Sequence, residues 1–349
     1  MKKLFSLFLI SLTCACAATA MACKKTEKPD DRETFTVTFD EGEGFSYVAA
    51  DTADTTDGET TENTEETESE PLTSVEVKDG DTVSFRLDIG AFYGGTPTVL
   101  AGDVAVSSVD DVYSFTVSAD TTVSVEGIQK DVSNMIGTGA YDNPFLVTRP
   151  IDLIYIADQV NAGNETYTSA TYVLGNDIDC KGEEIKVIGD LNNDRAFFSG
   201  CFVSNVDEAT NIRQRYTISD FVINSDDASY VGLFGCVQAT PAVTNSGLFF
   251  GIRLEDFEIN AGTEGINAGQ PVIYAGSLVG YGIGVVTEAC DAVGGALNLY
   301  ADDSYFAFAG GLIGCQQGLY EQSYGLPYPS EISYATVDVD VTGVKGAPL

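Results

Sequence analysis

The residues of this chain that could do chemistry are its carboxylates and tyrosines, because it contains no His and no Trp. Histidine is the commonest general acid–base residue and metal ligand, so Ser-His-Asp and Cys-His catalysis and His-based zinc sites are excluded. The 53 acidic and 17 basic residues give a formal net charge of −36. That charge argues against a nucleic-acid partner, since phosphates are bound by Lys and Arg. The composition favours binding over catalysis, and we predict no cofactor.

Three charged residues come nearest to a catalytic pairing. Arg213 and Arg215 alternate along an expected strand and so share one face, and Asp220 follows closely. A solvated charged face, which is far more common, has the same pattern. No spacing isolates the pair of carboxylates that an inverting glycoside hydrolase needs. We therefore predict a non-catalytic protein, with a carbohydrate-active β-helix enzyme as the alternative.

One acidic segment is similar to the start of a calcium-binding loop. Residues 190–194 place oxygen-bearing side chains at alternate positions. Arg195 stands where such a loop needs glycine, and Cys201 stands where it needs glutamate. We interpret the segment as a polar turn and predict no metal site, with weak Ca²⁺ binding left open as the alternative.

A tyrosine-rich stretch is the best candidate for ligand binding. Tyr320, Tyr324 and Tyr328 lie with two prolines in residues 318–330, where they interrupt the rhythm of the expected strands. Loops on a rigid scaffold usually carry recognition, and tyrosine contacts sugars and proteins well. We predict that these three tyrosines bind a surface glycan or protein ligand. The alternative is that they pack back on the scaffold.

The scaffold itself is indicated by three short boxes that end in a small residue, two apolar residues and glycine. The boxes are Val231–Gly235, Gly276–Gly280 and Gly310–Gly314. Their closing glycines lie 45 and 34 residues apart, a recurrence typical of stacked supersecondary units. We expect Leu233, Leu278 and Leu312 to point inward as a ladder. The glycines are expected at corners that need positive φ or close backbone approach.

Five cysteines follow Cys23, at positions 180, 201, 236, 290 and 315. An odd number at wide spacing is a poor disulfide framework. Cys236 and Cys315 each directly follow a box, so we expect them to be small buried hydrophobic residues stacked at equivalent positions.

Alternating Val, Ile, Thr, Tyr and Phe runs dominate the chain and predict an all-β fold. Residues 34–128 are expected to form a small β-sandwich-like module. Within it, the acidic segment 51–71 is predicted to be disordered. A linker is expected at 129–136. The one predicted helix spans 150–163, from Pro150 to Gly163, with an apolar stripe at helical spacing.

The N-terminus has the pattern of an export signal, expected over residues 1–22. Two lysines precede the apolar stretch 4–12, which is too short to span a membrane stably. Cys23 follows small residues as in a bacterial lipoprotein cleavage box, so we predict lipidation at Cys23 and a polar tether over 23–33. The alternatives are ordinary cleavage after Ala22 and, more weakly, lipidation at Cys16.

The order of motifs over residues 137–349 resembles that of GLUG-motif bacterial surface proteins, which are adhesin-like. The resemblance rests on the repeated boxes and on the segments 142–147, 160–161, 176–179, 188–190 and 198–202. It implies a right-handed, parallel β-helix-like solenoid capped by the predicted helix. Cys180, Cys201 and Ser277 depart from the usual pattern and affect the expected repeat register.

The first module resembles internalin B-repeats, which occur in extracellular multidomain proteins. The resemblance rests on Val75 to Phe85 and on the segment from Tyr113 to Gly127. Together with the lipoprotein pattern at Cys23, the two resemblances imply a lipoprotein anchored at the bacterial cell envelope and exposed on the surface. We expect an adhesive or ligand-binding role, with a structural surface-assembly component as a further alternative. Because no second cap is visible beyond Thr342, we also expect that the sequence is truncated after Leu349.

Overall fold

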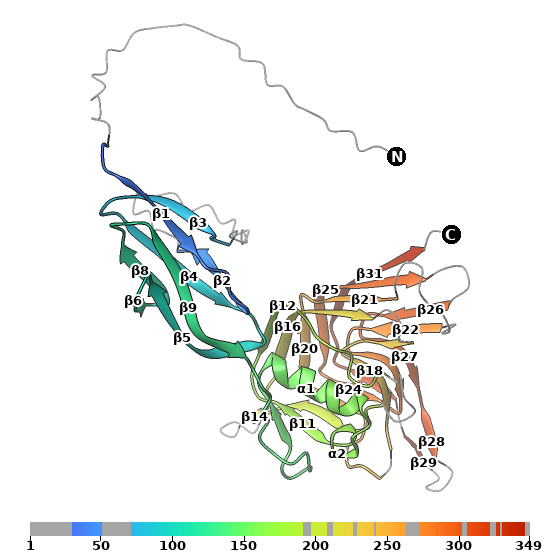
Figure 1. Cartoon of the computed structure of the whole chain (residues 1–349). Coiled ribbons are helices and arrows are strands. Elements are labelled where there is room, and N and C mark those ends of the chain that lie inside the picture. Colours follow the sequence, from blue (N-terminus) through green and yellow to red (C-terminus); the bar gives the residue numbers. More distant parts are fainter. Residues whose placement is uncertain are drawn as a thin grey trace, which may run out of the picture.

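The computed structural model (Figure 1) describes residues 30–50, 71–190, 197–207, 212–225, 229–240, 242–262, 272–301, 306–321, 326–328 and 330–345. Strands predominate over helices, and most strand pairs in the second part of the chain are parallel, so the predicted all-β, β-helix-like fold is confirmed. The predicted export signal 1–22, Cys23 and residues 51–70 of the acidic segment lie outside the described residues.

The N-terminal module packs two mostly antiparallel sheets face to face. One sheet has the order β3-β1-β9-β5-β6 and the other β2-β4-β8-β7. The strands are β1 (Thr34–Phe39), β2 (Phe45–Ala49), β3 (Ser74–Lys78), β4 (Thr82–Ile89), β5 (Tyr93–Ala101), β6 (Val104–Val106), β7 (Ser108–Val109), β8 (Val112–Thr116) and β9 (Thr121–Lys130). Alternate residues such as Val37 and Phe39 are buried, as period-two strands require. Phe39, Tyr47 and Phe85 bring their rings together between the sheets.

The second part of the chain is a solenoid whose successive coils add strands to the same sheets. The side sheet contains β10 (Phe145–Val147), β11 (Thr171–Leu174), β13 (Cys201–Ser204), β19 (Leu248–Phe250), β24 (Val286–Glu288) and β30 (Glu331–Ser333). The long sheet contains β12 (Ile178–Glu184), β16 (Tyr216–Ser225), β20 (Ile252–Glu255), β21 (Glu258–Ala261), β25 (Asp291–Ala301) and β31 (Val337–Lys345). Every pairing in these two sheets is parallel, as in a β-helix.

Two three-stranded parallel sheets, the corner sheets, complete the coils. One contains β17 (Tyr230–Val231), β22 (Val272–Gly276) and β26 (Phe306–Gly310). The other contains β18 (Phe234–Gln238), β23 (Val279–Ile283) and β27 (Ile313–Gln317). Each repeated box forms the turn from one corner sheet to the other. Two antiparallel hairpins project from the coils, β14 (Val206–Asp207) with β15 (Ile212–Arg213) and β28 (Leu319–Glu321) with β29 (Leu326–Tyr328).

The predicted leucine ladder is confirmed. Leu233, Leu278 and Leu312 are at most 4% exposed and belong to one continuous core. Their coils are joined by backbone bonds from Leu233 N to Ser277 O and from Leu278 N to Leu312 O, both 3.0 Å long. These shared leucine positions explain why the boxes recur.

The box glycines are required by close backbone approach. A Cβ at Gly280 would lie 2.5 Å from the Val231 nitrogen, and one at Gly314 would lie 2.6 Å from the Ala275 oxygen. Neither glycine has positive φ. The two corner sheets therefore pass so near one another that a side chain larger than hydrogen has no room.

The boxes differ in length at the corner. Val231 pairs with Ala275 and Phe234 pairs with Val279, so the first corner is one residue shorter than the second. When the first two boxes are aligned on Leu233 and Leu278, the residues after the corner are matched with their true strand partners. The residues before the corner are offset by one position.

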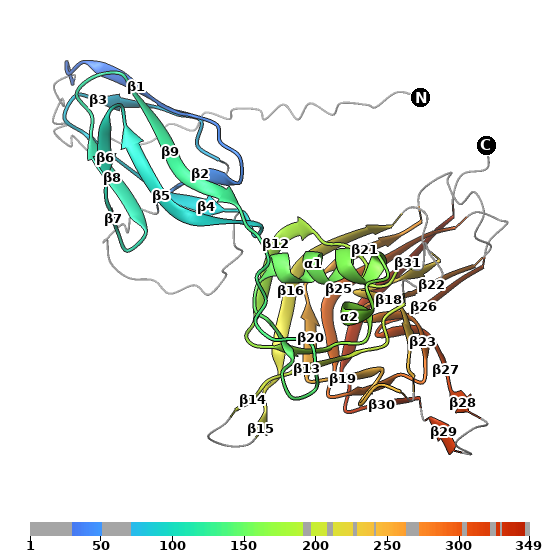
Figure 2. The same ribbon diagram turned by 60° about the horizontal axis from the view of Figure 1, so that its bottom comes forward.

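Helix α1 (Pro150–Asn161) lies in the first coil, where it replaces strands (Figure 2). Pro150 occupies the first turn, and Gly163 has a φ of +71° just after the helix, as the sequence predicted. Its buried stripe includes Leu153 and Ile156 and joins the solenoid core. The prediction of one helix was incomplete, because a short second helix, α2 (Glu165–Thr168), follows, with Asn164 as its N-cap.

The segment expected to be a linker is bonded to the solenoid. Strand β9 already extends to Lys130, and the following residues run against the start of α1. Arg149 binds Asp131 at 2.7 Å and donates to Asn134 Oδ1 at 2.9 Å, while Ser133 Oγ donates to the buried Asp152 at 2.8 Å. The module and the solenoid are thus joined by a short, hydrogen-bonded connection.

Candidate functional site

Two of the three predicted tyrosines lie on a projecting hairpin. Tyr320 is on β28 and Tyr328 is on β29, where the backbone pairs Tyr320 with Pro327 and Leu319 with Tyr328. The hairpin therefore brings Tyr320 and Tyr328 to adjacent rungs. Tyr324 lies outside the described residues. The predicted ligand-binding role of the three tyrosines stays a prediction.

A ladder of aromatic rings lies on the corner sheets, from which this hairpin emerges. Tyr230, Tyr274 and Phe308 come from β17, β22 and β26, and their rings stack in order. The ring centroids are 5.8 Å apart for Tyr230 and Tyr274 and 5.2 Å apart for Tyr274 and Phe308, with interplanar angles of 13°. Phe308 ends the ladder and is 49% exposed, so it presents an accessible apolar ring.

A fourth ring joins the ladder across the corner. The Tyr281 centroid lies 5.2 Å from both the Tyr230 and Tyr274 centroids. Its hydroxyl donates to Gln317 Oε1 at 2.8 Å, at the end of β27, directly before the tyrosine hairpin. The ladder, Tyr281 and Gln317 thus form one continuous surface that leads to the base of the hairpin.

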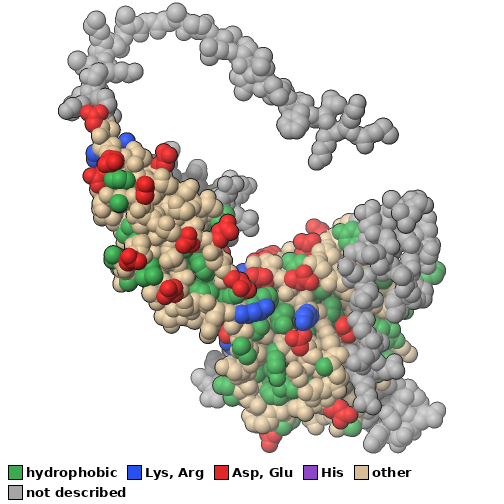
Figure 3. All heavy atoms as spheres, viewed as in Figure 1, with side chains coloured by type: hydrophobic (Ala, Val, Ile, Leu, Met, Phe, Trp, Pro, Cys, Tyr) green, Lys and Arg blue, Asp and Glu red, His purple; other side chains and the backbone are tan. Residues whose placement is uncertain are grey.

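The strands of this surface are uncharged where the structure describes them. The described strands β17, β18, β22, β23, β26 and β27 contain no Asp, Glu, Lys or Arg, although charged residues make up 20% of the chain. We call it the uncharged face and define it by Tyr230, Tyr274, Tyr281, Phe308 and Gln317. By contrast, Figure 3 shows acidic side chains scattered over the described surfaces of the module and of the nearer part of the solenoid.

Tyr230 and Tyr281 of the uncharged face are neutral at ordinary pH. Burial is the main cause that raises the pKa of Tyr230 and of Tyr281 above the usual value. Their hydroxyls therefore remain both donors and acceptors of hydrogen bonds. Such groups beside exposed rings suit a neutral ligand that has apolar patches and hydroxyls.

Sequence reasoning missed this aromatic ladder although a signal was present. Each ladder ring stands two residues before a corner glycine, in Tyr230–Gly232, Tyr274–Gly276 and Phe308–Gly310. The repeat therefore extends beyond the boxes toward the N-terminus, where an aromatic residue recurs with each of them.

Of the three charged candidates for catalysis, Arg215 has a partner elsewhere in the solenoid. Arg215 pairs with Asp291 on β25, a residue that is only 2% exposed, and so neutralises a buried carboxylate. Asp220 lies in β16 with a φ of +52°, and Arg213 lies on the separate hairpin strand β15. The ion pair of Arg215 is thus with Asp291, and not with Asp220.

Possible metal ligands do not gather in the described part of the chain. No group of three or more His, Cys, Asp or Glu side chains there is arranged to hold a metal ion. In the segment resembling a calcium loop, Asp190 is described, and its backbone N–H donates to Asn161. Residues 191–194 lie outside the described residues.

The five cysteines that the structure describes are unbridged, and four of them are buried. Cys236 and Cys315 occupy equivalent positions as expected, with Tyr281 of the middle coil between them. The expected burial is confirmed for Cys236 and is wrong for Cys315, which is half-buried. Burial raises the pKa of Cys236 to about 11 and that of Cys290 to about 12. These thiols are therefore protonated and unreactive at neutral pH.

Comparison with known proteins adds no family. Searches against protein-family models, curated proteins and solved structures found no match to this chain. Among the described residues, no helix has the length and apolar character needed to cross a membrane.

Proposed function

We propose that this chain is a non-catalytic lipoprotein of the bacterial cell surface that binds a neutral glycan on its uncharged face. The observation that carries the proposal is the stacked ladder of Tyr230, Tyr274 and Phe308 on strands without charged residues. Export and lipidation at Cys23 are part of the proposal and rest on the N-terminal sequence pattern alone.

The charge of the chain supports a neutral ligand. With a net charge of −36, the protein repels anionic polymers at long range. The uncharged face allows a glycan to approach without displacing ion pairs. The ring of Phe308 offers an apolar contact, and Tyr281 and Gln317 offer hydrogen-bonding groups beside it.

The chemistry of the uncharged face is not specific to glycan-binding sites. Exposed aromatic residues without charge occur in protein interfaces as well as in sugar sites. A protein ligand, a carbohydrate-active enzyme and a structural assembly role are therefore outcomes that the experiment must separate.

The test is affinity electrophoresis of the protein through gels that contain a neutral β-glucan, mannan or galactan, or the anionic polymer polygalacturonate. We expect at least one neutral polymer to retard the protein and polygalacturonate to have no effect. Phe308→Ala should weaken the retardation at least fivefold. Tyr141→Ala is the matched control, because Tyr141 is 63% exposed but lies before α1, outside the uncharged face.

Several results would contradict the proposal. Retardation by no neutral polymer, or equal weakening in both variants, removes the glycan-binding role of this face. New reducing or unsaturated ends on the polymer would show an enzyme. Recovery of only a bacterial envelope protein in a pull-down would favour a structural role. Tyr320→Ala and Tyr328→Ala extend the test to the hairpin, where loss of binding with an unchanged melting temperature would assign these residues to the ligand.

A further inference from the structure

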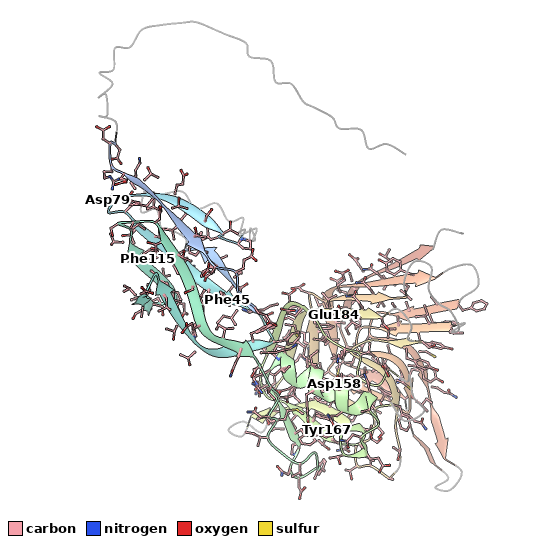
Figure 4. All side chains as sticks on the ribbon, in the orientation of Figure 1. Phe45, Asp79, Phe115, Asp158, Tyr167 and Glu184 are labelled. Carbon is pink, nitrogen blue, oxygen red and sulfur yellow. The ribbon has the colours of Figure 1, made fainter. Side chains whose placement is uncertain are left out.

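The N-terminal module contains a pocket that the proposed function does not use. It has a volume of about 280 Å³, and its lining includes Phe39, Asp40, Glu41, Phe45, Tyr47 and Leu72. Figure 4 places Phe45 at the end of the module nearer the solenoid and Asp79 at the opposite end. The pocket therefore lies on a different body of the molecule from the uncharged face.

The walls of the pocket are held by the two sheets. The Phe39 backbone donates to Thr73 O at 2.9 Å, and the Leu72 backbone donates to Tyr47 O at 2.7 Å. The rings of Phe39 and Tyr47 are almost fully buried, whereas Phe45 and Leu72 are only partly covered. These contacts give the pocket an apolar, largely preformed interior.

The rim of the pocket is acidic. Asp40 and Glu41 are exposed at its mouth, and neither forms an ion pair with any described residue. The described part of the module, residues 30–50 and 71–130, has 15 acidic and only 4 basic residues. Arg32 binds Asp30 and Asp81, and Lys78 binds Thr34, so both are engaged away from the pocket.

We propose that this pocket binds a primary ammonium group on an apolar stem, as presented by a lysine side chain of a partner peptide. The methylene stem packs against Phe45 and Leu72, and the ammonium group lies between the carboxylates of Asp40 and Glu41. The aromatic ring of Phe45 adds a favourable cation–π contribution, and the acidic module attracts the cation from a distance.

The test is a ligand-observed NMR titration of the whole protein with Nα-acetyl-lysine methylamide. Its matched probe is Nα-acetyl-norleucine methylamide, which has a similar stem but no charge. We expect the lysine probe to bind saturably and at least tenfold more tightly than the norleucine probe. In the double variant Asp40→Asn, Glu41→Gln, its affinity should fall at least fivefold.

The control is the double variant Asp110→Asn, Asp111→Asn. This pair is also consecutive and exposed, and its φ values of +51° and +63° are ones that asparagine tolerates. It should bind the lysine probe as the unaltered protein does. Equal binding of the two probes, equal loss in both double variants, or no saturable binding of the lysine probe overturns the proposal. None of these results affects the glycan test.

Discussion

Two surfaces of the same solenoid cover one core but have opposite chemistry. The long sheet faces outward with acids, a few bases and a ladder of asparagines, whereas the corner sheets face outward with rings, cysteines and glutamines. Their inward residues are alike, since both supply buried aliphatic and aromatic side chains to one cluster. The repeat of the coils thus constrains which residues face the core. The residues that face outward are free to differ and can form a binding site.

The long sheet uses its polar groups to bind itself. Asn224 donates to Glu184 at 3.0 Å, Asn260 donates to Asn224 at 2.9 Å, and Asn298 donates to Asn260 at 3.0 Å. Arg253 pairs with Glu255 at 2.8 Å on the same sheet. The asparagines join one coil to the next and the ion pair lies within one strand, so the long sheet uses its polar groups as a structural surface. The uncharged face has an exposed ring, which is why we assign the ligand to it.

Leu278→Ala should have the largest effect on stability, because it removes a fully buried rung shared by both surfaces. Leucine-to-alanine changes in cores cost about 2–5 kcal/mol. Tyr281→Phe, which removes only a surface hydrogen bond to Gln317, should cost about 1 kcal/mol or less. Urea unfolding followed by circular dichroism compares the two. An equal loss of unfolding free energy in the two variants would contradict the view that the core, and not the uncharged face, stabilises the coils.

Arg215→Ala should have a smaller but clear effect on the long sheet. It leaves the carboxylate of Asp291, which is 2% exposed, without its cation, although the Thr336 N–H still donates to it at 2.7 Å. Because Arg215 itself is 43% exposed, we expect a loss of about 2 kcal/mol. Arg253→Ala is the matched control, and its partly exposed pair with Glu255 should be worth about 0.5 kcal/mol. A similar loss in both variants would mean that the burial of Asp291 is unimportant.

The cysteines give the smallest effect, a difference in labelling rate with no change in stability. At pH 8, iodoacetamide should modify the half-buried Cys315 at least tenfold faster than Cys236 or Cys290. The thiolate is the reactive form, and burial raises the pKa of Cys236 to about 11, so its rate should rise only as the pH approaches that value. Peptide mapping by mass spectrometry measures each site. Faster labelling of Cys236 would mean that the uncharged face opens in solution.

The fold was largely predictable because the inward pattern repeats. Leu233, Leu278 and Leu312 recur with glycines that only close packing explains, and the stripe of α1 has helical spacing between Pro150 and Gly163. The short α2 was not predicted, because four residues carry no measurable periodicity. The one-residue difference at the first corner also escaped prediction, since register depends on pairing between coils.

The candidate site was less predictable. The ladder of Tyr230, Tyr274 and Phe308 depends on which coils are neighbours, and that information is tertiary. Arg215 and Asp291 are likewise distant in sequence and meet only through the parallel stacking of the long sheet. The tyrosine stretch was visible because it breaks the strand rhythm, and a break in rhythm locates a loop without indicating its ligand.

The pairing of the module's first and last strands governs how the molecule carries mechanical load. Strand β1 begins the module and β9 ends it, and the two are parallel neighbours through Val37 with Thr121 and Phe39 with Val123. A force that separates the N-terminus from the solenoid pulls the start of β1 and the end of β9 in opposite directions. Because the two strands are parallel, that force loads all the hydrogen bonds between them at the same time, in shear. The bonds are not broken one after another from one end. The module is therefore built to resist stretching between its N-terminus and the solenoid.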